Sequence, residues 1–109
     1  MSRIHYPACE VEVDAFEEGA EDFSCEDAEV WIEDNVILIS YFDDEGIVVL
    51  EGTEDGNQGW QLMARSRPRR AFLRPLPEKA GCFVGEIEEQ GETAAWRVSL
   101  GAPQKENDV

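Results

Sequence analysis

Along most of the chain, apolar and polar residues alternate with a period of two. In segment 10–15 acidic residues alternate with Val and Ala, and in segment 96–100 Trp, Val and Leu alternate with Arg and Ser. Successive side chains of a β-strand point to opposite faces of a sheet, so this pattern predicts strands with one buried face. The predicted strands cover residues 11–15, 28–33, 36–42, 47–53, 60–65, 69–74, 82–89 and 93–100.

Turn-forming residues separate these segments. Asp34 and Asn35 are residue types that tolerate positive φ in a two-residue hairpin, and Gly46 and Gly91 mark two further turns. Pro75 removes a backbone donor and ends the strand before it. Because turn signals recur at intervals of roughly 8 to 12 residues with no helical period between them, the sequence predicts an all-β fold.

Short connections mean that sequence neighbours pair with each other. We therefore expect an antiparallel meander of about eight short strands that closes, or nearly closes, into a small barrel. A two-sheet β-sandwich gives the same pattern and stays an alternative. In either case residues 10–100 form a single all-β domain, residues 1–9 a flexible N-terminal segment and residues 101–109 a disordered polar tail.

The hairpin formed by segments 36–42 and 47–50 departs from the alternation because both of its faces are apolar. A solvated antiparallel sheet normally shows one polar face, so something is expected to cover the outer face of this hairpin. We predict a homodimer whose interface includes one hairpin face, with Leu38, Val48 and Leu50 on the other face. The predicted interface residues are Ile37, Ile39, Ile47 and Val49.

Composition and charge narrow the class of protein. The chain has 109 residues, 42% of them hydrophobic, and 25 acidic against 9 basic residues give a formal net charge of -16. The hydrophobic fraction is too high for a disordered acidic chain, and no apolar run approaches the roughly 20 residues that span a bilayer. Residues 4–64 include 18 acidic residues and no Lys or Arg, a field that repels nucleic acid and attracts a basic protein partner. We expect no nucleic-acid and no membrane partner.

Five of the nine basic residues fall within ten positions that contain no acid. Alternation suggests that the first three of them share one face of the chain. Their planar guanidinium groups suit phosphate, carboxylate or an acidic partner, but they equally serve as an internal counter-charge that pairs with neighbouring Glu and Asp. The sequence leaves both interpretations open for this arginine stripe, which consists of Arg65, Arg67, Arg69, Arg70 and Arg74.

Few residues are candidates for catalysis. His5 is the only histidine, and we expect it to be an exposed residue near the amino terminus rather than a catalytic base or a haem ligand. Glu86 and Glu88 share a strand face, which is typical of a solvated face beside a turn and only rarely of a hydrolytic carboxylate pair. We predict no enzymatic activity.

The sequence also gives little support for a metal site or for redox chemistry. Cys9, Cys25 and Cys82 are odd in number and widely spaced, which disfavours a disulfide framework and a zinc site. The acidic turns lack the spacing of a calcium loop. We therefore expect reduced cysteines, no cofactor and no metal, and, since residues 1–7 do not resemble a secretory signal, a cytoplasmic location.

Two functions follow from these observations. The first is a non-enzymatic acidic β-barrel that acts as a binding module, associates with itself and binds a basic protein. The alternative is a small-ligand barrel of the lipocalin-like or streptavidin-like kind, with a site at the barrel rim. The residues suited to such a rim site are Ser40, Tyr41 and Thr53.

Overall fold

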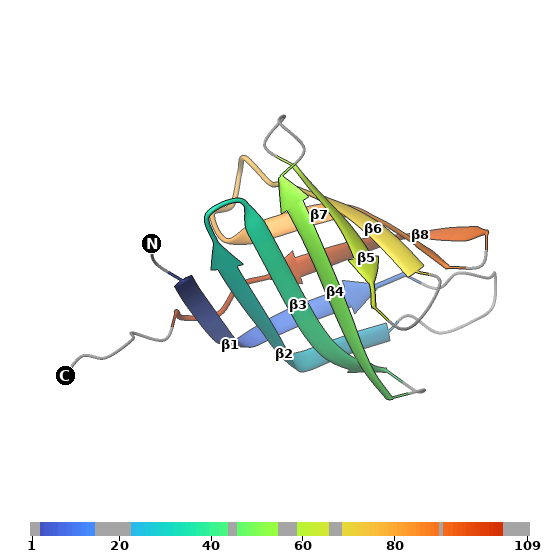
Figure 1. The fold of residues 1–109 in the computed structure, drawn as a ribbon, viewed down its shortest axis with the longest axis horizontal. Coiled ribbons are helices and arrows are strands. Elements are labelled where there is room, and N and C mark those ends of the chain that lie inside the picture. Colours follow the sequence, from blue (N-terminus) through green and yellow to red (C-terminus); the bar gives the residue numbers. More distant parts are fainter. Residues whose placement is uncertain are drawn as a thin grey trace.

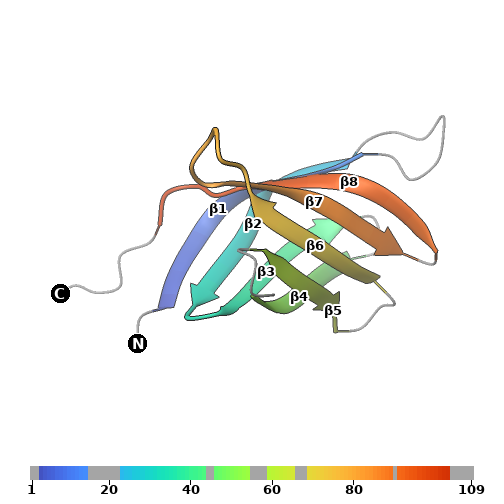
Figure 2. The same ribbon diagram turned by 90° about the horizontal axis from the view of Figure 1, so that it is seen from above.

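A computed structural model shows eight antiparallel strands joined in chain order (Figures 1 and 2). It describes residues 3–14, 23–43, 46–54, 59–65, 69–89 and 91–103. Among these residues there is no helix. The strands are β1 (Arg3–Val13), β2 (Phe23–Glu33), β3 (Val36–Asp43), β4 (Gly46–Glu54), β5 (Trp60–Ala64), β6 (Arg69–Pro75), β7 (Cys82–Glu89) and β8 (Glu92–Ser99).

The meander closes on itself. Each strand pairs with the next, and β1 pairs with β8 through a register in which Glu10 faces Ser99 and Val13 faces Trp96. In both views β1 and β8 run side by side (Figures 1 and 2). The predicted all-β meander and its closure into a barrel are confirmed, and the sandwich alternative is not what forms. Closure gives every strand two hydrogen-bonded neighbours over part of its length, although the end of the β3–β4 hairpin pairs only with itself.

The turn residues adopt the backbone conformations that their types favour. Asp34 has φ 55° in the tight turn between β2 and β3, while Gly46 has φ 119° at the start of β4 and Gly91 has φ 86° between β7 and β8. Positive φ is costly for most residues but not for Gly, and it is tolerated by Asp. These turns fix the registers, so Glu33 faces Val36 and Glu89 faces Glu92.

One face of every strand is buried inside the barrel. Trp96 is the largest fully buried side chain, and its indole Nε1 donates to the Phe72 carbonyl oxygen at 3.1 Å. The interior is therefore a hydrophobic core that side chains from all eight strands supply. Its apolar members are Cys9, Val11, Val13, Ala28, Val30, Ile37, Ile39, Tyr41, Val48, Leu50, Trp60, Leu62, Ala71, Leu73, Ile87, Ala94, Trp96 and Val98.

Two glycines allow neighbouring strands to approach closely. A Cβ at Gly52 would overlap the Gln61 carbonyl oxygen, and a Cβ at Gly85 would overlap the Phe72 carbonyl oxygen. Glycine within a strand commonly marks a bend or a close backbone approach, and a barrel this small needs such positions. The Phe72 carbonyl that Gly85 accommodates is also the acceptor for Trp96, so this glycine and the largest core side chain depend on the same peptide group.

Two expectations need correction. First, β1 begins at Arg3, so residues 3–9 are a paired strand and not a flexible segment; its register with β2 shifts between Tyr6 and Cys9. Second, Ile37 and Ile39 face Gly52 and Leu50 across the β3–β4 pair, which places them inside the barrel.

Directly opposite residues of an antiparallel pair share a face. It follows that Ile37 and Ile39 share a face with Val48 and Leu50, and that the predicted grouping with Ile47 and Val49 is wrong. Leu38, predicted on the face of Val48 and Leu50, instead lies on the outer face, opposite Glu51. Alternation could not set the phase of β3, because every position from Val36 to Ile39 is apolar.

Candidate interaction surface on the outer face of β3 to β6

The arginine stripe is divided between the two sides of the barrel wall. Arg65 and Arg70 are exposed on the outside, and Arg69 points inside, although alternation placed Arg65 and Arg69 on one face. Arg65 lies directly after β5 and Arg69 at the start of β6, so the alternation of one strand does not carry over to the next. Arg67 lies in that connection, outside the described residues. Arg74 is exposed on the outer face of β6.

The outward arginines beside β5 pair with glutamates of neighbouring strands. Arg65 Nη2 lies 2.9 Å from Glu51 Oε1 and Arg70 Nε lies 2.8 Å from Glu88 Oε1. These two arginines therefore act as the counter-charges that one of the two interpretations predicts. Exposed pairs of this kind contribute about 0.2–1 kcal/mol each, so their main effect is to neutralise the local surface.

Arg69 is a charged residue inside the barrel. Its Nη1 donates to the Tyr41 hydroxyl at 3.0 Å and its Nη2 lies 2.5 Å from Glu89 Oε1. Burial by itself lowers the pKa of the guanidinium, but the Tyr41 oxygen and the Glu89 carboxylate outweigh burial, so the pKa of Arg69 is raised. Arg69 thus remains charged inside the barrel, where its guanidinium lies between Tyr41 near the end of β3 and Glu89 at the end of β7.

The three predicted rim residues do not form one site. Tyr41 is buried inside the barrel, whereas Ser40 and Thr53 lie on its outer face. Ser40 faces Val49 and Thr53 faces Val36, at positions four residues apart along β4. The interior bonds of Tyr41 and the separation of the other two leave no shared rim pocket for these residues.

The outer face of β3 to β6 carries several exposed large apolar side chains. Phe42 and Ile47 face each other across the end of the β3–β4 hairpin and are 61% and 53% exposed. Met63 on β5 is 66% exposed and Phe72 on β6 is 44% exposed. Leu38 and Val49 are half-buried between these positions. We call these six residues the outer apolar surface.

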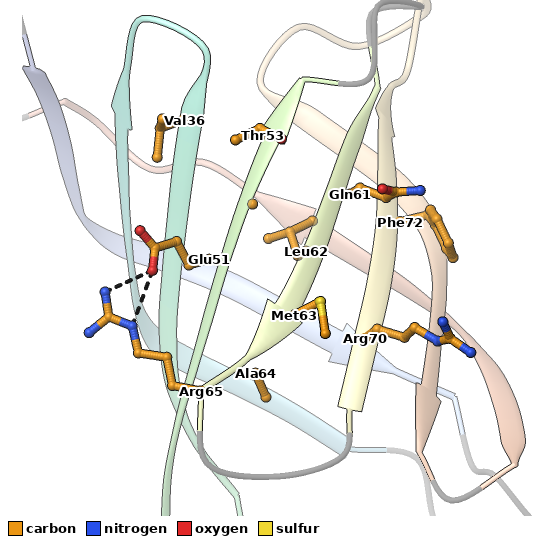
Figure 3. Close-up of a pocket in the computed structure, with 11 residues that line it drawn as sticks. Val36, Glu51, Thr53, Gln61, Leu62, Met63, Ala64, Arg65, Arg70 and Phe72 are labelled. Carbon is orange, nitrogen blue, oxygen red and sulfur yellow. Dashed lines mark hydrogen bonds and ion pairs between the residues drawn. The ribbon is translucent and has the colours of Figure 1, made fainter.

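A groove follows part of this surface (Figure 3). It has a volume of about 560 Å³ and lies over β4, β5 and β6. Met63 and Phe72 supply apolar walls, while Arg65 and Arg70 stand near its ends with Glu51 facing Arg65 (Figure 3). The groove brings together three sequence-predicted candidates, Arg65, Arg70 and Thr53, on an apolar floor that was not predicted.

The predicted dimer residues divide between the interior and the outer face of the barrel. Ile37 and Ile39 are 0% exposed and belong to the core, so they cannot contact a partner. Ile47 and Val49 lie on the outer apolar surface. Sequence reasoning missed Phe42, Met63 and Phe72 as surface candidates. The alternation itself carried a signal for Met63, which stands between Gln61 and Arg65 on the polar side of its strand.

Other candidate groups are occupied in structural contacts. The His5 ring stacks on Trp31 with ring centroids 4.6 Å apart, and its Nε2 lies 3.1 Å from Glu29 Oε1. His5 is therefore anchored on β1, not an exposed residue of a loose terminus. Glu88, one of the two carboxylates on the outer face of β7, pairs with Arg70.

The thiols show no arrangement that supports catalysis. Cys9, Cys25 and Cys82 are free. Burial raises the pKa of the Cys9 thiol, whose Sγ donates to the Tyr6 carbonyl oxygen at 3.3 Å, so the nucleophilic thiolate form is disfavoured. The described residues contain no group of three or more His, Cys, Asp or Glu side chains placed to hold a metal ion. Nor do they contain a helix long and apolar enough to cross a membrane.

Comparisons with protein-family models, with curated proteins and with solved structures gave no match to this chain.

Proposed function

We propose that this chain is a non-enzymatic binding module that associates with itself through the outer apolar surface. The observation that carries the proposal is the exposure of Phe42, Ile47, Met63 and Phe72 on adjoining strands of one closed sheet. Large apolar side chains gathered on one face of a small barrel are typical of a protein interface. The barrel is closed, and the four adjoining strands present this apolar surface on its outer side, so the proposed association uses side-chain contacts.

Charge also favours this surface over the rest of the barrel. Two copies with a net charge of -16 repel each other over most orientations. On the outer apolar surface, however, Arg65 and Arg70 neutralise Glu51 and Glu88, so two such surfaces meet with little local repulsion. Added salt should therefore strengthen self-association, because it screens the long-range repulsion and leaves apolar contacts intact. Association with a basic partner would show the opposite salt dependence.

The test is sedimentation of the purified chain over a concentration series at low and at high salt. We expect a dimer that tightens with salt, and we expect Ile47→Asp or Val49→Asp to weaken it by about a hundredfold or more, because each buries an unpaired carboxylate. Thr93→Asp is the matched control. It adds the same charge at an exposed position of β8, four strands away around the barrel.

A wild-type chain that stays monomeric at every salt concentration would refute the proposal. So would a dimer that Thr93→Asp weakens as much as Ile47→Asp, because the effect would then be one of total charge and not of place. A cytoplasmic location and a basic protein partner remain predictions beside this proposal.

A further inference from the structure

Arg74 differs from the other described arginines whose side chains are placed. Arg65, Arg69, Arg70 and Arg97 each have a glutamate oxygen within 3.1 Å of a guanidinium nitrogen. Arg74 is exposed and, within the described part of the chain, has no ion-pair partner. In a chain with 25 acidic residues, a guanidinium left available for other ligands is unexpected.

The side chain of Arg74 lines a second groove on the outside of the barrel, with a volume of about 610 Å³. Arg74 faces Val84 on β7, and Val84 faces Arg97 on β8, so the two arginines flank one apolar residue across three strands. Phe72 and Val84 contribute exposed apolar surface to the same groove, whereas Trp60 and Trp96, which also line it, are buried in the barrel wall behind it. The lining is apolar and polar in similar measure, and a concave site of this size with a few charged groups fits a small amphipathic molecule.

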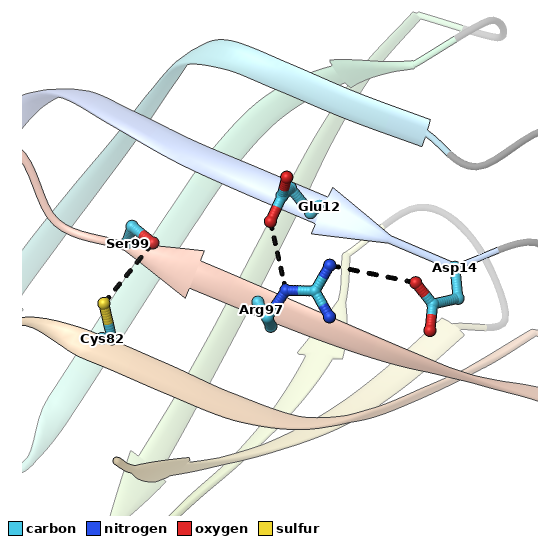
Figure 4. A network of polar contacts seen from close by, with 5 residues as sticks. All are labelled: Glu12, Asp14, Cys82, Arg97 and Ser99. Carbon is cyan, nitrogen blue, oxygen red and sulfur yellow. Dashed lines mark hydrogen bonds and ion pairs between the residues drawn. The ribbon is translucent and has the colours of Figure 1, made fainter. Parts of the chain in front are cut away.

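Arg97 is held in place by the neighbouring strand. Its Nε donates to Glu12 Oε1 at 3.1 Å, and its Nη2 lies 4.0 Å from Asp14 Oδ1 (Figure 4). Between β7 and β8, Cys82 Sγ lies 3.6 Å from Ser99 Oγ, and neither side chain contacts Arg97 (Figure 4). Glu12 uses one of the five N–H donors of the guanidinium, so Arg97 is oriented but can still donate hydrogen bonds.

Glu86 limits what the groove accepts. Glu86 is exposed and lies two residues after Val84 on β7, on the same outer face. It pairs with Phe72 of β6 and Ala95 of β8. Its carboxylate disfavours a second negative charge at that end of the groove. A ligand therefore gains most when a single anionic group meets Arg74 and Arg97 and an apolar body lies along Phe72 and Val84.

We propose that the groove between Arg74 and Arg97 is a binding site for a small amphipathic monoanion, a carboxylate, sulfonate or phosphate monoester on an aromatic or aliphatic body. The site stands on observations separate from the proposed self-association. Phe72 is the one residue common to the two grooves, and the hairpin residues Phe42 and Ile47 take no part in the second.

The probe is 8-anilinonaphthalene-1-sulfonate, with the uncharged N-phenyl-1-naphthylamine as its matched analogue. Energy transfer from Trp60 and Trp96 to the dye reports that the dye is bound, and the comparison of the variants assigns the binding to this groove. Binding is measured for the wild type, Arg74→Gln, Glu86→Gln and the control Arg70→Gln, an exposed arginine of the same strand on the other groove. Each measurement is repeated in an Ile47→Asp background, so that failure of self-association and failure of this site are distinguished.

We expect Arg74→Gln to weaken sulfonate binding about tenfold, the loss of one charge-assisted hydrogen bond, and Arg70→Gln to leave it unchanged. Glu86→Gln should strengthen it, and the uncharged analogue should bind about tenfold more weakly than the sulfonate. Because Arg74 and Glu86 are exposed, both variants should fold, and at high salt, where charge repulsion is screened, they should melt like the wild type. Equal binding by Arg74→Gln and Arg70→Gln, or equal binding of the two dyes, overturns the proposal.

Discussion

At the scale of single residues, Arg69 and Arg70 show that a shift of one position along a strand changes whether a charged side chain is buried or exposed. The two are adjacent on β6, and each has a glutamate of β7 as its partner. The Arg69 side chain is 8% exposed and that of Arg70 is 63% exposed. The first charge depends on its partner for solvation, whereas water solvates the second.

This contrast predicts unequal effects for two neighbouring carboxylates. Glu89→Ala should lower the free energy of unfolding by about 3–5 kcal/mol, because it removes the carboxylate from a buried guanidinium. Glu88→Ala should lower it by about 0.2–1 kcal/mol, because its partner is exposed. Urea unfolding of both variants measures the difference. Similar losses would mean that water reaches the Arg69 guanidinium inside the barrel.

Arg69 also shows what sequence could not predict at this scale. Its inward direction is set by the register of β6 against β5 and β7, and alternation within one strand says nothing about the next. The pairing of Arg65 and Arg70 with glutamates was among the expected outcomes. That Arg74 has no ion-pair partner among the described residues was not expected, because this depends on which side chains of β7 and β8 lie beside it.

At the scale of elements, turn residues and close glycine contacts set how the strands meet. Several strand ends were predictable because Asp34, Gly46 and Gly91 mark turns, but β1 and β2 begin at Arg3 and Phe23, well before the predicted starts at residues 11 and 28. The phase of β3 was not predictable, because a strand that is apolar on both sides carries no alternation to count. Gly52 and Gly85 were not recognised either, since the need for a bare backbone arises only once the neighbouring strand is placed.

Gly85→Ala should therefore destabilise the barrel although it adds only one methyl group. Its Cβ would overlap the Phe72 carbonyl oxygen, which is backbone and cannot rotate away. We expect a loss of about 1–3 kcal/mol. The Trp96 emission should shift at the same time, because Phe72 is the acceptor of its indole N–H.

Gly91→Asn is the control for this substitution. Gly91 has φ 86° with nothing within 4 Å of an added Cβ, and Asn tolerates that conformation, so the loss should be below about 1 kcal/mol. Thermal unfolding followed by tryptophan fluorescence compares the two variants. An unchanged melt for Gly85→Ala would show that β6 and β7 can separate locally at no cost.

At the scale of the whole molecule, the excess of negative charge opposes the compact state. The described exposed ion pairs of Arg65, Arg70 and Arg97 involve few of the 25 acidic residues. Most of the remaining carboxylates therefore repel one another across a small barrel, and salt screens that repulsion over a distance of about 10 Å at 0.1 M.

The melting temperature of the monomeric Ile47→Asp variant should therefore rise from low to high salt. Arg70→Gln should lower it more at low salt than at high salt, because its exposed charge offsets the repulsion. Arg69→Gln should lower it by nearly the same amount at both, because counter-ions do not reach a buried charge. Thermal melts across a sodium chloride series test all three. A melting temperature that falls with salt would mean that the ion pairs outweigh the repulsion.

The register between β1 and β8 has a consequence for synthesis. Of the eight strands, β1 is synthesised before the others, and it finds its second neighbour only when Ser99, the partner of Glu10, has followed. Until then the nascent sheet carries one incomplete side along β1, with backbone groups open to pairing with another chain. Pausing of translation within β7 would thus prolong a stage at which the side of β1 that β8 later covers is exposed to co-aggregation.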